Sequence, residues 1–380
     1  MKIGILTLPS SFNYGGILQA FAMQHTLDKL GYDNVILRRE RPIVAVNNKG
    51  AKVICKNFIK KILGRDIYAI PNEEQKQYIE VECRRFIEAN LRKTTQAAYD
   101  TDQLAKLYCD NEVDTIIVGS DQVWRPHMTA DIRNYFLDFC GDEIKKIAYA
   151  ASFGVDNWEY SDDDTVLCSE LAKEFNLITV REDSGVRLCK EYLGVEAKHV
   201  LDPTMLLTPE DYFSLVEKCS VPKSKGNLFC YILNENKTKS NFVRELASRY
   251  ALEPFMVLPK RDAYFNNNAD KCIEECIYPS PAVWIRAFMD AECVVTDSFH
   301  GTVFSIIFNK PFWVIANKSR GNARFESLLK MFHLEHRYIY DIKNVKMEDL
   351  VMGIDWDEVN KIRQEKKMFS IHLLREALNG

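Results

Sequence analysis

The sequence predicts an α/β protein with two domains, each built on a parallel sheet that helices cover on both faces. Short apolar runs alternate with amphipathic segments along both halves of the chain, as in proteins with parallel sheets. The chain has 380 residues, which is more than one ordinary hydrophobic core accommodates. A segment with two prolines, residues 201–209, separates the halves. Within it Thr208 is the expected N-cap of a new helix.

Six apolar runs in the first half have the length of buried strands. These are Ile3–Leu8, Val35–Leu37, Thr115–Val118, Ile147–Ala151, Leu177–Val180 and Lys198–Leu201. Helices are expected between them. In residues 17–30 the apolar side chains recur near helical spacing and Gly31 provides a stop signal, and a second such pattern covers residues 79–90.

The second half repeats this alternation. Its strand candidates are Asn227–Leu233, Phe255–Leu258, Cys293–Thr296 and Phe312–Ile315, and its helix candidates are Lys239–Tyr250, Pro281–Ala291, Thr302–Phe308 and Arg324–Phe332. We therefore expect a first domain over residues 1–205 and a second over residues 206–355. The charged, amphipathic residues 356–380 are expected to form a last helix that packs back on the first domain.

The composition restricts the class of protein. Hydrophobic residues make up 47% and charged residues 27%, as in soluble globular proteins, and no apolar run approaches the ~18 residues of a membrane span. A cytoplasmic protein is expected, with room for peripheral contact with a membrane-bound substrate. The net charge of −4 argues against nucleic acid as a partner. Cys272 and Cys276 have the spacing of a metal-binding pair, but no second pair lies near them, so no metal is expected.

The segment Thr296–Thr302 is the strongest functional signal in the chain. It joins a strand to a helix, which is where α/β proteins place their chemistry. Free N–H groups at a helix N-terminus attract anions, and His300 would place a titratable imidazole among them. His300 is therefore the predicted catalytic residue, with a core histidine that bonds the backbone as the alternative.

Two motifs in the first half are candidates for ligand binding. In Asn13-Tyr14-Gly15-Gly16 the glycines allow close approach of a ligand to the backbone, although a purely structural turn explains them equally well. In Gly119–Trp124, Asp121 is a candidate base or partner of a sugar hydroxyl, and Trp124 a candidate platform for a sugar ring. The alternative is that Asp121 caps a helix and Trp124 lies in the core.

Basic residues at two other strand ends are candidates for anion binding. Arg181 follows a predicted strand and can hold a carboxylate or phosphate through two parallel hydrogen bonds. The alternative is a surface arginine paired with the acidic residues that follow it. Lys318, Arg320 and Arg324 lie beyond the last predicted strand and are candidates for a basic rim, with ordinary solvated surface as the alternative for each.

Together these segments resemble the polysaccharide pyruvyl transferase family. The matching pieces, in the family's order, are Asn13–Gly16, Gly119–Trp124, Arg181–Ser184, Leu201–Thr204, Thr296–Gly301 and Lys310–Phe312. The resemblance implies two Rossmann-like domains of the GT-B kind with the active site in the cleft between them. It also implies transfer of pyruvate from phosphoenolpyruvate to a sugar as a ketal. Many members have arginine where this chain has Ser298.

The resemblance also implies roles for individual residues. His300, Asp121 and Asp297 are the expected catalytic groups. The expected donor-binding residues are Arg181, Ser298, Phe299, Gly301, Lys318, Arg320 and Arg324, and the expected acceptor- or anion-binding residues are Asn13, Gly15, Gly16, Ser120, Gln122 and Trp124. Phosphoenolpyruvate would be a co-substrate, with no further cofactor. The acceptor would be a glycan or a lipid- or nucleotide-linked sugar, as in the synthesis of exopolysaccharide, capsule or cell-wall glycan.

Two other functions are consistent with the same residues. One is a glycosyltransferase of the same architecture that binds the diphosphate of a nucleotide sugar at the helix N-terminus of the second domain. The other is a non-catalytic protein that binds a glycan or an anion.

Overall fold

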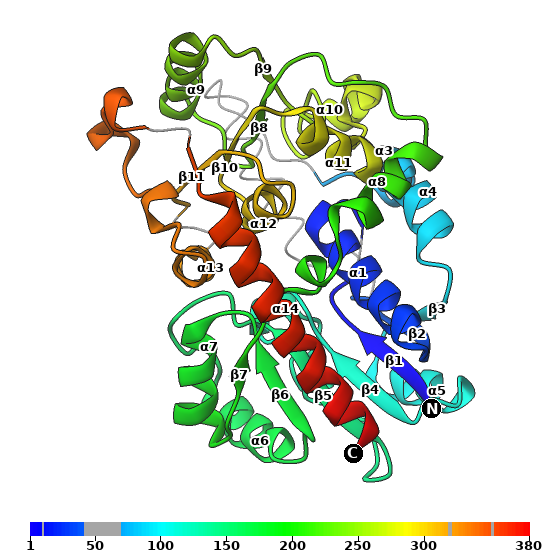
Figure 1. The fold of residues 1–380 in the computed structure, drawn as a ribbon. Coiled ribbons are helices and arrows are strands. Elements are labelled where there is room, and N and C mark those ends of the chain that lie inside the picture. Colours follow the sequence, from blue (N-terminus) through cyan, green and yellow to red (C-terminus); the bar gives the residue numbers. More distant parts are fainter. Residues whose placement is uncertain (10, 42–69, 318–320, 351–352) are drawn as a thin grey trace.

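The computed structural model describes residues 1–9, 11–41, 70–317, 321–350 and 353–380. Two parallel sheets, one above the other in Figure 1, confirm the predicted α/β class. The first has the order β3-β2-β1-β4-β5-β6-β7 and the second the order β12-β11-β10-β8-β9. The strands are β1 Lys2–Leu6, β2 Asp33–Arg39, β3 Thr94–Ala98, β4 Thr115–Val118, β5 Lys145–Ala151, β6 Leu177–Val180, β7 Lys198–His199, β8 Leu228–Tyr231, β9 Pro254–Phe255, β10 Cys293–Thr296, β11 Phe312–Ile315 and β12 Tyr338–Ile339.

Helices cover the faces of both sheets. They are α1 Tyr14–Leu30, α3 Glu73–Ile79, α4 Val81–Asn90, α5 Thr101–Asp110, α6 Asp162–Ala172, α7 Asp183–Leu188, α8 Pro209–Lys218, α9 Lys237–Tyr250, α10 Asn268–Lys271, α11 Pro281–Asp290, α12 Phe299–Ile307, α13 Ala323–Met331 and α14 Trp356–Asn379. Helix α1 ends where the sequence predicts, because Gly31 adopts the left-handed conformation (φ 86°) that glycine accepts without steric cost.

The strand orders define where a ligand can bind. In each sheet the order reverses once along the chain, between β1 and β4 in the first sheet and between β8 and β10 in the second. Loops that leave neighbouring strands at such a reversal run in opposite directions and open a crevice at the carboxyl ends of the strands. The fold therefore has two such crevices, one in each half of the chain.

The two sheets lie within the predicted ranges 1–205 and 206–355, but two helices depart from that division. Helices α3 and α4 precede β3 in the first sheet and pack on the second half of the molecule. The backbone N–H of Tyr278 donates to the carbonyl of Ile79 at 2.8 Å, and the thiol of Cys83 contacts the carbonyl of Pro279. The chain thus crosses between the two halves before it completes the first sheet.

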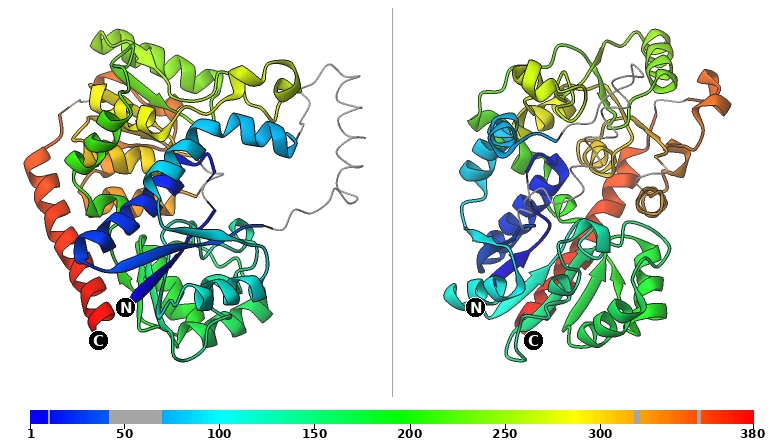
Figure 2. Two further views of the ribbon diagram at one scale, coloured as in Figure 1. Left: turned by 90° about the vertical axis from the view of Figure 1, so that its right-hand side faces the viewer. Right: turned by 180° about the vertical axis from the view of Figure 1, so that it is seen from behind.

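The last helix, α14, starts beside the second half of the molecule and runs along the first sheet, so it contacts both halves (Figures 1 and 2). Near its start, Arg363 donates to the carbonyl of Ile307 in α12 at 2.9 Å. Further along, the Ser370 hydroxyl accepts from the backbone N–H of Leu201 at 3.2 Å, and the side chains of Leu374 and Leu378 are fully buried. None of the described helices is long and apolar enough to cross a membrane.

We expect Leu374→Ala to lower the free energy of unfolding by about 2–5 kcal/mol, because it leaves a cavity in the core that α14 shares with the first domain. Met368→Ala on the same helix is the matched control. Its side chain is exposed, so we expect a change within about 0.5 kcal/mol. Urea unfolding measures both. Equal effects of the two substitutions would show that α14 is not anchored as described.

Candidate active site

The crevices of the two sheets open into one cavity of about 540 Å³. Its walls come from the loops after β1, β4, β8, β9 and β10 and from α13, so both halves of the chain contribute. The lining residues are Phe12, Asn13, Tyr14, Asp121, Gln122, Met128, Tyr231, Ile232, Leu233, Glu235, Leu258, Pro259, Asp262, Tyr278, Ser298, Phe299, His300, Arg324 and Phe325. Of the predicted site residues, the structure brings Asn13, Asp121, Gln122, Ser298, Phe299, His300 and Arg324 to this cavity.

Two helix N-termini meet at His300. Helix α12 starts one residue before it and is capped by Ser298, whose hydroxyl accepts from the N–H of Gly301 at 3.4 Å. Helix α1 of the first domain approaches His300 from the other side. The absence of a side chain at Gly15 permits this close approach. A Cβ atom on Gly15 would lie 2.0 Å from Nδ1 of His300. The Asn13 side chain makes no capping hydrogen bond, so first-turn N–H groups of α1 remain for an anion.

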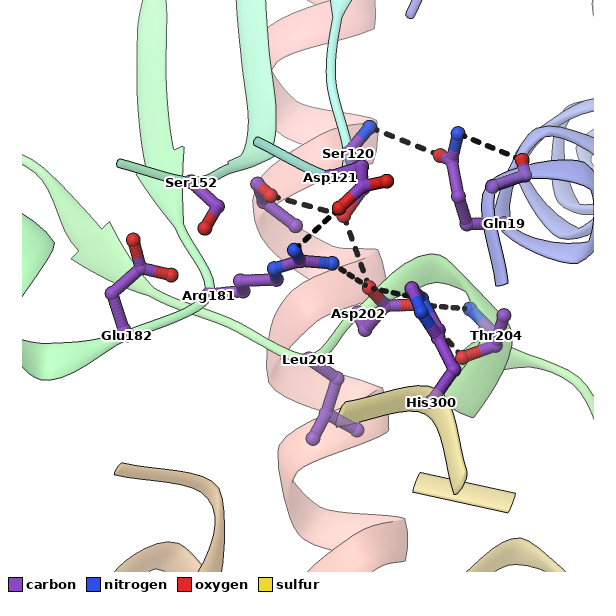
Figure 3. A network of polar contacts seen from close by, with 12 residues as sticks. Gln19, Ser120, Asp121, Ser152, Arg181, Glu182, Leu201, Asp202, Thr204 and His300 are labelled. Atoms are coloured by element: carbon purple, nitrogen blue, oxygen red, sulfur yellow. Dashed lines mark hydrogen bonds and ion pairs between the residues drawn. The ribbon is translucent and has the colours of Figure 1, made fainter. Parts of the chain in front are cut away.

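Asp202 supplies the negative charge beside this imidazole. Its Oδ2 atom lies 3.6 Å from Nε2 of His300, a distance suited to an ion pair rather than a hydrogen bond. The same oxygen accepts from Nη1 of Arg181 at 2.8 Å and from the Ser120 hydroxyl at 3.1 Å (Figure 3). The other oxygen accepts from the N–H and the hydroxyl of Thr204. Side chains from two strand ends of the first domain thus converge on the carboxylate that faces a histidine of the second.

Positive charges around Asp202 and Asp121 oppose the effect of burial on the pKa values of these two carboxyl groups. Burial alone would raise the pKa of Asp202, but His300 and Arg181 outweigh it and hold that pKa well below its usual range. For Asp121, burial likewise opposes ionisation, and the positive charge of Arg181 leads the effects that lower its pKa. Burial lowers the pKa of Arg324 to about 10, and the nearby charge of Arg181 adds to this effect.

The ring of Phe299 contacts two arginines, one that lines the cavity and one that lies behind the ring. Cζ of Arg181 lies 4.5 Å from the centroid of this ring, and Cζ of Arg324 lies 5.5 Å from it. Such contacts between a cation and an aromatic ring are stabilising, more so away from water. Arg324 lines the cavity, whereas Arg181 lies behind the ring and is almost fully buried.

The predicted role of Arg181 needs correction. We expected its guanidinium to hold the donor directly, but its two terminal nitrogens are already bound, Nη1 to Asp202 and Nη2 to Asp121, both at 2.8 Å. The sequence places an arginine at a strand end without showing which carboxylates meet it in space. Of the expected donor-binding cations, Arg324 is the one that reaches the cavity, while Lys318 and Arg320 lie outside the described residues.

Two other predicted site residues, Trp124 and Asp297, are structural. Trp124 is fully buried, stacks on Phe136 with ring centroids 4.9 Å apart, and cannot form a platform for a sugar. Asp297 is also fully buried. Its carboxylate accepts from Nζ of Lys239 at 2.6 Å and from the N–H of Leu233 at 2.7 Å, so it fixes the loop after β8 and is not a free base.

Ser120, Gly16 and Gly301 are fully or almost fully buried and do not line the cavity. Gly301 allows α12 to begin close to β10, since a Cβ atom there would lie 2.2 Å from the Thr296 hydroxyl. Asp202, Phe12 and Tyr278 are site residues that the sequence reasoning missed. For Asp202 a signal exists, because an Asp-Pro pair directly follows the predicted strand Lys198–Leu201. Among the described residues, no group of three or more His, Cys, Asp or Glu side chains is arranged to hold a metal ion.

The profile of the polysaccharide pyruvyl transferase family matches residues 13–319. The chain therefore belongs to the polysaccharide pyruvyl transferase family. No curated protein matches its sequence.

Solved structures with related folds include sugar-nucleotide enzymes. The UDP-GlcNAc 2-epimerase from Neisseria meningitidis, bound to UDP-GlcNAc, is 11% identical, with a TM-score of 0.51 over 99% of this chain and 100% of that chain. The ADP-heptose lps heptosyltransferase II from E. coli is 10% identical, with a TM-score of 0.37 over 97% of this chain and 100% of that chain. At such identities the likeness concerns the fold alone, and the likeness to the epimerase agrees with the predicted GT-B arrangement.

We expect Gly15→Ala to reduce turnover strongly without destabilising the protein. Alanine favours a helix over glycine by about 1 kcal/mol, so the main effect is the displacement of the His300 ring. The measurements are turnover at saturating substrate and urea unfolding. Gly353→Ala is the control, since no heavy atom lies within 4 Å of the added carbon. Normal turnover in folded Gly15→Ala would refute the tight contact.

We expect Asp202→Asn to lower the free energy of unfolding by about 3 kcal/mol at pH 7, because it leaves buried Arg181 with one carboxylate instead of two. The depressed pKa of Asp202 stabilises the fold above the unfolded value of about 3.9, and this contribution declines as the pH falls towards the folded value.

The difference in the free energy of unfolding between the parent and Asp202→Asn should therefore narrow below about pH 4. Urea unfolding across this range measures it, with the exposed Asp163→Asn as control. If the free energies of unfolding of the two proteins differ more as the pH falls, the depressed pKa of Asp202 is contradicted.

Proposed function

We propose that this protein transfers pyruvate from phosphoenolpyruvate to two hydroxyls of a sugar, forming a ketal. Membership of the family supports the reaction class. The observation that carries the proposal is the setting of His300, which lies at the cavity between two helix N-termini with Asp202 behind it. That setting provides a proton donor, its counter-charge and an anion seat within one site.

In the proposed reaction His300 donates a proton to the methylene carbon of phosphoenolpyruvate. The neighbouring carbon becomes cationic, one sugar hydroxyl attacks it, phosphate leaves, and a second hydroxyl closes the ketal. The two hydroxyls lose two protons; the new methyl group gains one and phosphate takes the other. Asp202 lies 3.6 Å from Nε2 of His300 and is the counter-charge for the imidazolium in this scheme. The scheme needs phosphoenolpyruvate as co-substrate and no further cofactor.

The donor is an anion at both ends, with a carboxylate and a phosphate. We assign one end to Arg324 and the other to the uncapped N–H groups of α1, since both face the same cavity as His300. Arg181 acts behind them. It pairs with Asp121 and Asp202 through its two terminal nitrogens, and its contact with Phe299 supports the ring that separates it from the cavity.

We expect His300→Ala to lose about 10²–10⁴-fold in turnover while it stays folded. The assay combines phosphoenolpyruvate with a panel of glycan acceptors and follows phosphate release and, by mass spectrometry, the pyruvyl adduct. His300→Gln keeps hydrogen bonding without proton transfer, so it should be as slow as His300→Ala if the proton is what matters. His372→Ala, on an exposed part of α14, is the matched control.

Ligand-induced thermal stabilisation separates the proposal from its rivals. Stabilisation by phosphoenolpyruvate supports it. Stabilisation by a nucleotide sugar, without an effect of phosphoenolpyruvate, would point to a glycosyltransferase, and stabilisation by glycan alone to a binding protein. Turnover of His300→Ala within a few-fold of the parent would also overturn the proposal.

A further inference from the structure

The cavity is chemically divided along the edge of the second sheet. The strand order β11-β10-β8-β9 places the loops that follow these strands side by side. Arg324 follows β11 and His300 follows β10, and they are the two basic residues among the described lining residues. Glu235 follows β8 and Asp262 follows β9, and both are exposed carboxylates. One end of the cavity therefore has both basic side chains, together with Asp121, whose carboxylate is bonded to Arg181, and the other end has Glu235 and Asp262.

The end with Glu235 and Asp262 is also aromatic. Phe12 from the first domain stacks on Tyr278 from the second, with ring centroids 4.5 Å apart and planes inclined by 23°. Asp262 lies near this pair: burial raises the pKa of the Tyr278 hydroxyl, and the charge of Asp262 adds to that effect. Tyr14 lines the same cavity. It is 1% exposed, and its hydroxyl has no hydrogen-bond partner in the part of the chain that the structure describes.

These features suit a different ligand from the donor. Carboxylates repel phosphate and carboxylate groups, but they accept hydrogen bonds from hydroxyls. An aromatic face contacts the apolar C–H surface of a sugar ring, and a buried unpaired hydroxyl gains a partner when a polyol binds. A cavity of about 540 Å³ is also larger than a three-carbon donor needs.

We infer that the end of the cavity formed by Phe12, Tyr14, Glu235, Asp262 and Tyr278 is the acceptor subsite and that it selects an uncharged sugar over an acidic one. This inference rests on the proposed function for the place of the donor, which occupies the end with His300 and Arg324. A sugar held on Tyr278 presents its hydroxyls across β8 towards the loop after β10, where His300 lies.

The test compares neutral sugars with their uronic acids. The probes are methyl β-glycosides of glucose, galactose and mannose and of the three corresponding uronic acids, titrated by NMR at fixed ionic strength. We expect at least one neutral glycoside to bind about tenfold more tightly than its uronic acid. Asp262→Asn should weaken neutral binding about fivefold and narrow the gap to the uronic acid, because it replaces one acceptor oxygen with an amide donor and removes the negative charge.

Tyr278→Ala should weaken both members of a pair by about tenfold. Asp262 is exposed, so its variant tests the inference even if Tyr278→Ala fails to fold. Asp270→Asn is the matched control: this residue is exposed on α10, bonds Gln75 and does not line the cavity. We expect it to leave both affinities unchanged.

The outcomes distinguish this inference from the proposed function. Phosphoenolpyruvate should stabilise the parent, Asp262→Asn and Asp270→Asn equally against heat. If it stabilises none of them while neutral glycosides bind as described, the proposed donor is wrong and the subsite stands. If pyruvate is transferred but uronic acids bind as tightly as neutral glycosides, if no neutral glycoside binds, or if Asp262→Asn does not narrow the gap, the subsite is refuted.

Discussion

The buried carboxylate of Asp202 is the group on which the rest of the site depends. A buried charge is costly unless it is closely paired. Asp202 is paired with Arg181 and His300 and accepts hydrogen bonds from Ser120 and Thr204. Ser120 ends one strand, Arg181 ends another, and Thr204 starts the link to the second half. His300 comes from that second half. A single ionised group thus sets the position of two strand ends, the linker and the imidazole.

Besides this network, the backbone of two helices contributes to the charge of the cavity. The end with His300 and Arg324 needs few basic side chains, because two helix N-termini contribute partial positive charge in fixed positions. Arg324 adds one full charge, while the charge of Arg181 is balanced by two carboxylates before it reaches the cavity. The opposite end has aromatic rings and carboxylates instead. Strand order alone places these two environments next to each other without mixing them.

The sequence predicts the elements that depend on a local apolar pattern. It does not predict which polar side chains face the cavity, because that depends on the direction in which each side chain points. The strands Thr115–Val118, Leu177–Val180, Cys293–Thr296 and Phe312–Ile315 are predicted to the residue because apolar runs mark buried parallel strands. The strands β3 and β12 are missed, since Thr94–Ala98 has no strongly apolar run and β12 has two residues. His300 is expected at the cavity and is found there. Trp124 and Asp297 also follow strands, yet they face the protein interior, and sequence position does not specify that direction.

The contact between Gly15 and His300 joins residues from different halves of the chain. The imidazole and its counter-charge likewise come from different halves, with His300 after β10 and Asp202 at the end of the first sheet. Both contacts exist only where the two halves pack together. The proposed site is therefore a property of that packing: a substitution that shifts one half against the other changes the distance between His300 and Asp202 without touching either residue.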